Sequence, residues 1–184
     1  MIFEPTTLKD AWLIKPEKLS DKRGFFARTW CQREMEEKGL VARLVQANIS
    51  YNATRGTLRG MHYQIAPYEE TKLVRCTRGA IYDVIIDLRE DSPTFRQWFG
   101  VDLTAENSHM LYVPEGFAHG YQTLQDDTEV AYQVSEFFTP NSERGIHYQD
   151  PAFAVEWPLE VSVISEKDAG WVPYTLANRS AAGG

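Results

Sequence analysis

The segment KLVRCTRGAIYDVIIDL, residues 72–88, consists of two runs of strand-forming residues on either side of Arg78-Gly79. Valine, isoleucine and tyrosine are enriched in β-strands. A glycine at the junction supplies the positive φ that tight turns require. We therefore predict strands over residues 72–77 and 80–88, joined by a hairpin-like connection.

Further apolar runs follow along the chain at the spacing expected of short strands separated by turns. They span residues 94–104, 110–114, 121–124 and 130–138. One segment, residues 32–39 (QREMEEKG), has strong helix formers and ends at Gly39, which is typical of a helix C-terminus. Many strands and almost no helix predict an all-β fold, either a double-sheet jelly roll or a closed barrel. Such folds carry their sites in the concavity between their sheets.

The chain has 184 residues, of which 43% are hydrophobic and 24% are charged. This length and composition predict a single folded domain over residues 1–176, followed by a disordered tail over residues 177–184. The net charge of −7 argues against a nucleic-acid partner, because nucleic acids are bound through a basic surface.

The sequence also argues against a secreted or membrane protein. No run approaches the ~20 consecutive apolar residues of a membrane span. The N-terminus, MIFEPTTLKDAW, lacks the basic and apolar regions of a signal peptide. The two cysteines, Cys31 and Cys76, are too few for a disulfide framework and lack metal-ligand spacing, so we expect free thiols. We therefore expect a cytoplasmic protein with no membrane partner.

The segment LRGMHYQ, residues 58–64, places Arg59 and His62 within an expected strand. Neither residue type belongs in a plain strand core. Three interpretations of the pair compete: a metal site, a proton-transfer site, or a polar patch without chemistry.

The metal interpretation rests on a second histidine. The segment VPEGFAHGYQ contains a P-x-G-x-x-H pattern ending at His119, which resembles the second motif of the cupin jelly rolls, where such a histidine binds a metal. The first cupin motif normally reads H-x-H, whereas here Gln64 follows His62 in place of the second histidine. Glutamine is a poor ligand for zinc or iron. We therefore expect a cupin frame without its metal, and no cofactor.

The proton-transfer interpretation starts from His62, because histidine titrates near neutral pH and suits general-base catalysis. A carboxylate that fixes its tautomer would help, and the segment SEKDAG offers Asp168. The same segment has a structural explanation, because Ser165-x-x-Asp168 resembles a capping box that opens a short helical turn. On these residues alone the capping explanation is favoured. Lys72 and Tyr132 also have ordinary explanations, as an exposed strand charge and as a core tyrosine between valines.

Taken together, several stretches resemble one family, and the similarity covers about residues 3–174. They occur in the order and spacing of the dTDP-4-dehydrorhamnose 3,5-epimerases, which are cupin-type nucleotide-sugar epimerases. The stretches are DKRGFFARTW, VQANISYN, TLRGMHYQ, KLVRCTRGAIYDVIIDLR, VPEGFAHGY, AYQVSEFF, ERGIHYQDP and SEKDA. The resemblance implies a cupin jelly roll (a double-stranded β-helix) with a few short helices and a metal-independent isomerase site. Its substrate would be a nucleotide-diphosphate 4-keto-6-deoxy-hexose.

The resemblance also implies a role for individual residues. His62 matches the base that removes a proton beside the sugar ketone, and Asp168 matches the aspartate that orients it. Tyr132 matches the acid on the other face of the sugar, and Lys72 matches the lysine near the C4 oxygen. The residues that match positions holding the sugar, the diphosphate or the nucleoside are Arg23, Gln46, Asn48, Arg59, His119, Phe138, Glu143 and Lys167.

The chemistry explains why such residue types are needed. The C3 and C5 protons are weakly acidic because both carbons flank the C4 ketone. Removing one proton places negative charge on the C4 oxygen, which a fixed cation such as Lys72 stabilises. Inversion requires the proton to leave one face and return on the other, hence a base and an acid on opposite sides. A guanidinium such as that of Arg59 suits a diphosphate oxygen.

Two positions depart from the family pattern. The segment DKRGFFAR ends in Arg28, where the family motif D-x-R-G-x-F-x-E has a glutamate that contacts the nucleotide. Arginine can only donate hydrogen bonds, so Arg28 either favours an acceptor on the base or a phosphate, or pairs with a carboxylate in solvent. The identity of the base and of the sugar therefore stays open. Phe138 stands where the family often has a tyrosine, and it can still stack on a base.

Alternative functions also stay open. An enzyme of the same fold could invert C3 only, or could act on a CDP-sugar. A non-enzymatic cupin could bind a sugar as a sensor or store. Tyr132 favours an enzyme, because a binding protein has no use for a proton donor opposite the base. The resemblance further implies a homodimer in which N-terminal strands are exchanged between subunits.

Overall fold

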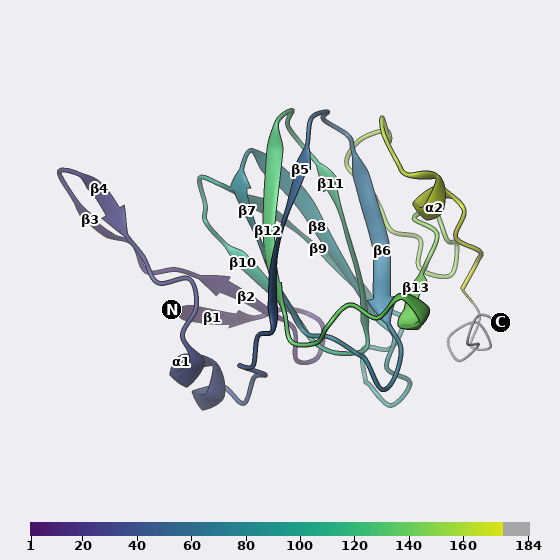
Figure 1. The fold of residues 1–184 in the computed structure, drawn as a ribbon, viewed down its shortest axis with the longest axis horizontal. Coiled ribbons are helices and arrows are strands. Elements are labelled where there is room, and N and C mark those ends of the chain that lie inside the picture. Colours follow the sequence, from purple (N-terminus) through teal and green to yellow (C-terminus); the bar gives the residue numbers. More distant parts are fainter. Residues whose placement is uncertain (175–184) are drawn as a thin grey trace.

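The computed structural model describes residues 1–174, and the tail expected over residues 177–184 lies outside them. Figure 1 shows two β-sheets that face each other and a hairpin that projects from the N-terminal side of the body. No helix among the described residues is long and apolar enough to cross a membrane.

The two sheets contain eleven strands of the described chain, and their pairings are antiparallel. The first sheet has the order β1 (Ile2–Pro5), β2 (Trp12–Lys15), β10 (Met110–Val113), β7 (Lys72–Arg78), β12 (Thr128–Val134) and β5 (Gln46–Asn52). The second has the order β13 (Glu143–Gly145), β6 (Leu58–Gln64), β11 (Phe117–Thr123), β8 (Ala80–Asp87) and β9 (Trp98–Thr104). The helices are α1 (Gln32–Glu37), η1 (Pro140–Ser142) and α2 (Glu166–Ala169). The predicted all-β double-sheet fold with a few short helices is confirmed.

The connection between β7 and β8 corrects one prediction. Gly79 has the expected positive φ of 75°, but the two strands lie in different sheets and do not form a hairpin. The chain crosses from one sheet to the other at this glycine. A Cβ there would lie 2.5 Å from the Oγ1 atom of Thr128, so the crossing requires the absence of a side chain. The hairpin prediction was wrong because strands from later in the chain pair with both runs.

Apolar side chains from both sheets fill the space between them. Val74 of β7, Ile81 and Ile85 of β8, and Val130 of β12 are completely buried in one cluster. Lys72 stands two residues before Val74 and therefore faces the same interior, at the end where the sheets are not filled by apolar side chains. Because residues two apart in a strand face the same side, the side chain of Lys72 lines the concavity between the sheets.

Helix α1 covers part of the outer face of the first sheet. Its buried Met35 packs in a cluster with Ile14 of β2 and Met110 of β10. The predicted C-terminal glycine is confirmed, since Gly39 has a φ of 69° and its N–H donates to the carbonyl of Glu36 at 2.9 Å.

The projecting hairpin consists of β3 (Leu19–Asp21) and β4 (Gly24–Phe26). We call residues 19–26 the arm. Within this chain its apolar side chains are uncovered: Leu19, Phe25 and Phe26 are 69%, 56% and 70% exposed. Large apolar side chains exposed together mark an interaction surface.

Candidate active site

A cavity of about 370 Å³ lies between the two sheets and gathers most of the predicted site residues. We call it the inter-sheet cavity. Its wall includes β5, β7 and β12 of the first sheet and β6, β11 and β13 of the second. The predicted residues in its lining are His62, Lys72, Tyr132, Gln46, Asn48, Arg59, His119, Phe138 and Glu143.

A bulge in β6 explains how Arg59 and His62 come to line the same cavity. In a regular strand, side chains three apart point to opposite faces. Here Arg59 is opposite Tyr121 and His62 is opposite His119, so β6 uses one residue more than β11 over this stretch. The extra residue returns both side chains to one face. Gly60 lies within the bulge with a φ of 131°, and a Cβ there would lie 2.5 Å from the backbone of β11.

His62 is hydrogen-bonded to Asp168. Its Nε2 atom lies 2.6 Å from Oδ1 of the aspartate, whose side chain is only 6% exposed. The other carboxylate oxygen accepts the N–H of Gly60 at 3.2 Å. Burial alone would raise the pKa of Asp168, but the His62 hydrogen bond and charge, with smaller help from Gly60 and Ser165, hold that pKa below its usual value. An ionised carboxylate only accepts, so Nε2 carries the hydrogen and Nδ1 is the basic nitrogen.

Asp168 takes part both in the cap of α2 and in a hydrogen bond to His62. The hydroxyl of Ser165 accepts the N–H of Asp168 at 3.1 Å and caps α2, as the capping explanation predicts. The aspartate side chain does not complete a capping box, because it turns to His62. The cap orients the turn that carries the carboxylate.

Tyr132 and His62 line the inter-sheet cavity from opposite sheets, Tyr132 from β12 of the first sheet and His62 from β6 of the second. Its ring is partly buried. Burial raises the pKa of its hydroxyl, the nearby Glu70 carboxylate raises it further, and Arg59 opposes the rise. The hydroxyl forms no hydrogen bond with any residue of the range 1–174 and therefore remains available to a ligand.

Lys72 is paired with a carboxylate that sequence reasoning missed. Its Nζ lies 3.2 Å from Oε1 of Glu70, and the two side chains are 10% and 14% exposed. Glu70 also lines the inter-sheet cavity. The signal that could have found it is its position two residues before Lys72 in an extended segment, because such residues face the same side.

His119 has a carboxylate partner of its own, Asp83 of β8. The Nε2 atom of His119 lies 2.8 Å from Oδ1 of Asp83, which is completely buried. Sequence reasoning missed Asp83, since 36 positions separate the two residues and only the pairing of β8 with β11 brings them together. Within residues 1–174, no group of three or more His, Cys, Asp or Glu side chains could hold a metal ion.

Arg59 differs from the other cations of the cavity because no carboxylate of the described chain pairs with it. Its Nε donates to the side-chain oxygen of Asn52 at 2.7 Å and its Nη2 donates to the carbonyl of Tyr51 at 3.3 Å. Asn52 is buried and was not predicted. Neutral acceptors orient the guanidinium without cancelling its charge, so Arg59 is suited to an anionic ligand.

Lys167 lies outside the cavity lining and reaches it through Glu143, whose carboxylate is 2.6 Å from Nζ of the lysine.

The two arginines of the segment DKRGFFAR lie away from this cavity. Arg23 stands at the turn of the arm, is 84% exposed and pairs with Asp21. Arg28 is exposed, pairs with Glu34 at 2.7 Å and does not line the inter-sheet cavity.

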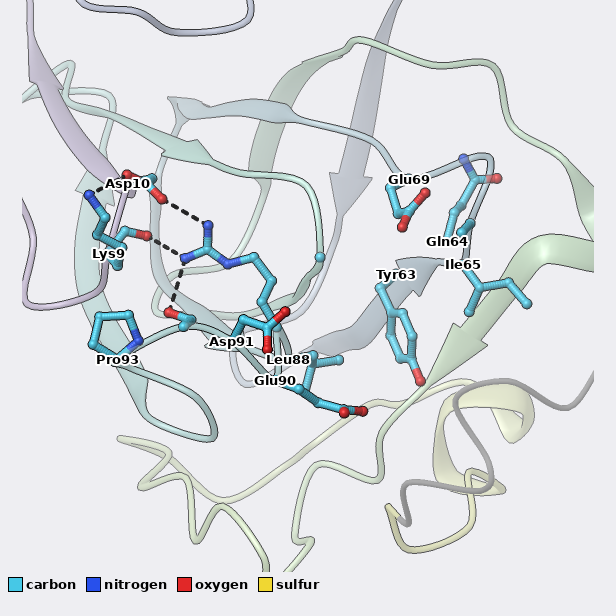
Figure 2. Close-up of a pocket in the computed structure, with 14 residues that line it drawn as sticks. Lys9, Asp10, Tyr63, Gln64, Ile65, Glu69, Leu88, Glu90, Asp91 and Pro93 are labelled. Carbon is cyan, nitrogen blue, oxygen red and sulfur yellow. Dashed lines mark hydrogen bonds and ion pairs between the residues drawn. The ribbon is translucent and has the colours of Figure 1, made fainter.

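A second cavity, of about 830 Å³, is larger than the inter-sheet cavity, and Arg89 is among the residues that line it. Figure 2 shows other residues of its lining, among them Asp10 and Tyr63. The guanidinium of Arg89 donates hydrogen bonds to the carboxylates of Asp10 and Asp87. None of the residues predicted to be catalytic lines this cavity, so its size does not mark the site.

The two facing sheets enclose a cavity with two histidines, each of which is hydrogen-bonded to its own aspartate. These features define the class of protein, a cupin-type jelly roll with ionisable groups in its concavity. The family model for dTDP-4-dehydrorhamnose 3,5-epimerase matches residues 5–175. The dTDP-4-dehydrorhamnose 3,5-epimerase of Shigella flexneri is 43% identical over 164 residues, which cover 89% of this chain and 90% of that protein. The chain belongs to this family.

Solved structures agree. The epimerase of Bacillus anthracis, with TDP and PPi bound, superposes with a TM-score of 0.91 at 42% identity, covering 94% of this chain and 99% of that one. The dTDP-6-deoxy-D-glucose-3,5-epimerase of Legionella pneumophila, in complex with dTDP-4-keto-L-rhamnose, gives a TM-score of 0.85 at 40% identity, covering 91% and 89%. A further relative, found by sequence and not as a solved structure, is a dTDP-4-dehydrorhamnose 3-epimerase of Streptomyces niveus, which is 36% identical over 91% of this chain and 81% of that protein.

Proposed function

We propose that the protein inverts C3 and C5 of dTDP-4-dehydro-6-deoxyglucose, giving dTDP-4-dehydrorhamnose, by proton transfer between His62 and Tyr132. The observation that carries the proposal is the position of Tyr132 across the cavity from the pair formed by His62 and Asp168. The family of the chain supports the substrate class.

The first step is the removal of a proton from C3 or C5 by the Nδ1 atom of His62. The electron pair of the broken C–H bond moves toward the C4 carbonyl, which becomes an enolate. The imidazolium formed at His62 is stabilised by the ionised Asp168, 2.6 Å away. The lowered pKa of Asp168 keeps that charge in place across the neutral range.

Lys72 is the group we assign to the enolate oxygen. Its ammonium is largely buried, where an electrostatic interaction is stronger than in water. The ion pair with Glu70 fixes the position of Nζ before the substrate arrives. Preorganised charge of this kind lowers the barrier because it need not reorient during the reaction.

Tyr132 then delivers a proton to the opposite face of the carbon, and inversion is complete. Its raised pKa keeps the phenol protonated until this step. The tyrosinate and the imidazolium return to their starting states by exchanging protons with solvent, so no group is consumed. The same two residues can serve both carbons, because in the D-gluco configuration the hydrogens on C3 and C5 lie on the same face of the ring.

The nucleotide part of the substrate is assigned to the polar and aromatic residues around these groups. Arg59 suits a diphosphate oxygen because its charge is oriented by neutral acceptors. Phe138 is 57% exposed in this chain and offers a stacking surface to the base. The polar wall that we assign to the sugar and nucleoside is completed by Gln46, Asn48, His119 and Glu143. Lys167 is assigned to the same role through its ion pair with Glu143.

We further propose that two subunits form a dimer in which the arm of one completes the cavity of the other. Arg23 lies in the turn between β3 and β4, at the tip of the arm, and does not line the inter-sheet cavity of its own chain. The arm's uncovered Leu19, Phe25 and Phe26 need a partner surface. The exposed Ile49 and Tyr51 on the outer face of β5 offer one.

A subunit-mixing experiment tests the dimer. Arg23→Ala and His62→Asn are each expected to be nearly inactive. After the subunits are exchanged, a mixed dimer contains one subunit of each variant. Such a dimer has one site with both Arg23 and His62 only if the arm of one subunit acts in the site of the other. Mixing should then restore about a quarter of the wild-type activity, since half of the dimers are mixed and each has one intact site. No recovery on mixing would show that Arg23 acts in its own chain.

Two alternatives remain as outcomes of experiment. The relatives include an enzyme named as a 3-epimerase, so inversion at C3 alone is the second candidate. The ion pair between Arg28 and Glu34 supports the solvent-facing explanation of Arg28 and therefore dTDP over CDP. The cytoplasmic location and the single domain over residues 1–176 stay predictions.

The chemistry is tested by His62→Asn. The variant should lose solvent exchange at both C3 and C5, measured by NMR in D₂O, while keeping its affinity for dTDP within about threefold. Substantial exchange by this variant would remove His62 from the mechanism. Binding without exchange by the wild-type protein would support the sugar-binding alternative.

A further inference from the structure

Gln64, which occupies the place of the second cupin histidine, uses its whole hydrogen-bonding capacity within the protein. Its Nε2 donates to the carbonyls of Tyr68 at 2.9 Å and Phe137 at 3.2 Å. Its Oε1 accepts the N–H of Thr139 at 2.7 Å. It also shares the hydroxyl of Ser142, 3.1 Å away, with the carbonyl of Thr139, which lies 2.7 Å from that hydroxyl. A primary amide has two donors and one oxygen with two lone pairs. None of this capacity remains for a metal or a ligand.

Three of these four hydrogen bonds hold one segment, residues 137–142. This segment connects β12 with β13 and carries Phe138 to the mouth of the inter-sheet cavity. Phe137 and Phe138 are more than half exposed, so packing holds the segment weakly. A further contact comes from Gln46, whose side-chain oxygen accepts the N–H of Phe138 at 3.0 Å.

We propose that Gln64 is a positioning residue that fixes residues 137–142 and thereby the ring of Phe138 against the nucleobase of the ligand. The inference rests on the proposed function, since it takes a nucleotide as the ligand. It extends that function by assigning to Gln64 a role in nucleotide recognition. Gln64 itself lies almost wholly buried and acts through the segment.

Only an amide side chain has both the donors and the acceptor that these hydrogen bonds need. Glutamate in its ionised form has no donor, and it would face the carbonyls of Tyr68 and Phe137 with a negative charge. Histidine has one donor and one acceptor when neutral, which leaves two of the four groups unsatisfied. Without these bonds the segment samples other conformations, and the apparent affinity for the base falls by the fraction of time that Phe138 is out of place.

The test compares the binding of dTDP with that of pyrophosphate, which lacks the nucleoside, by calorimetry. Gln64→Met keeps the length of the side chain and removes all four hydrogen bonds. We expect dTDP to bind roughly tenfold more weakly, and pyrophosphate to bind within about twofold of the wild type. Combined with Phe138→Ala, the Gln64→Met change should cost no further dTDP affinity, because there is no ring left to position.

A matched control is Gln122 of β11. It is also buried and spans a similar pair of bonds, to the carbonyl and N–H of Leu159 at 3.0 Å each, but lines none of the cavities. Gln122→Met should lower the melting temperature and leave dTDP affinity unchanged. If Gln64→Met does not fold, Gln64→Asn serves in its place, because its amide is neutral and is one methylene too short to reach the same groups.

Equal losses for dTDP and pyrophosphate would overturn the inference, because Gln64 would then support the cavity as a whole. The same would follow from an undiminished loss in the Phe138→Ala background. Turnover of the 4-keto sugar by the wild type is measured alongside, since its absence would reject the proposed function and not the positioning role.

Discussion

Replacing Asp168 by asparagine isolates the role of the carboxylate that contacts His62. The shape of the side chain is kept and its charge is lost. The N–H of Gly60 donates to Oδ2 of Asp168, so an asparagine would keep its oxygen on that side. Its NH₂ group would then face Nε2 of His62, 2.6 Å away in the wild type. Facing a donor, Nε2 would become the acceptor and Nδ1 would carry the hydrogen.

This is the tautomer that cannot act as the base. The variant would also leave the imidazolium without its counter-charge. We expect kcat to fall roughly 10³-fold, which corresponds to about 4 kcal/mol of barrier. The affinity for dTDP should change little, because Asp168 lies behind His62 and does not line the cavity. Steady-state kinetics, with dTDP binding measured separately, give both quantities.

Ser165→Ala is the control for the structural role of the same turn. It removes the cap of α2 but leaves the carboxylate, so it should cost about 1 kcal/mol of stability and change kcat by less than about fivefold. If Asp168→Asn lowers only the melting temperature, as Ser165→Ala does, the carboxylate serves the helix turn and our assignment is refuted.

Three further predictions concern Tyr132, Glu70 and the pH dependence of stability. Tyr132→Phe should keep the fold and proton removal by His62 but lose inversion, most visibly at C5; full 3,5-inversion would identify another donor. Glu70→Gln leaves the buried ammonium of Lys72 unpaired and should lower kcat about tenfold, whereas Glu69→Gln, outside the inter-sheet cavity, should not. Equal effects of the two would reject the pairing role. Asp168 has a folded-state pKa below its ordinary 3.8, so its stabilisation is complete above that value and is lost as the pH falls through the lower folded pKa. Chemical denaturation between about pH 5 and pH 2 should therefore show a weaker acid dependence in Asp168→Asn, and an unchanged slope would contradict the shift.

Much of the fold could be predicted from local pattern. The runs around Gly79, the helix ending at Gly39 and the short strands at regular spacing all follow from residue preferences that act over a few positions. What failed was the pairing across Gly79, because a turn residue and two apolar runs do not reveal whether the strands join the same sheet. That choice depends on the strands that arrive later in the chain.

The family resemblance predicted the residues of the candidate site one by one. It did not predict how these residues are arranged in space. The pattern at Arg59 and His62 implies opposite faces, and only the bulge in β6 brings the two side chains together. The pairing of Asp83 with His119 could not be predicted from the sequence, because the two residues stand on different strands of the second sheet. The fourfold hydrogen bonding of Gln64 could not be foreseen either, since a glutamine gives no sign of which backbone groups it will meet.

The central claim, that this cavity inverts both C3 and C5, is tested most directly by deuterium uptake. The wild-type protein is incubated in D₂O with dTDP-4-dehydro-6-deoxyglucose, and the protons at C3 and C5 are followed by NMR. We predict that both positions exchange and that the product has the inverted configuration at both carbons. Exchange and inversion at C3 alone would contradict the claim and assign the protein to the 3-epimerases, and exchange at neither carbon would contradict catalysis altogether.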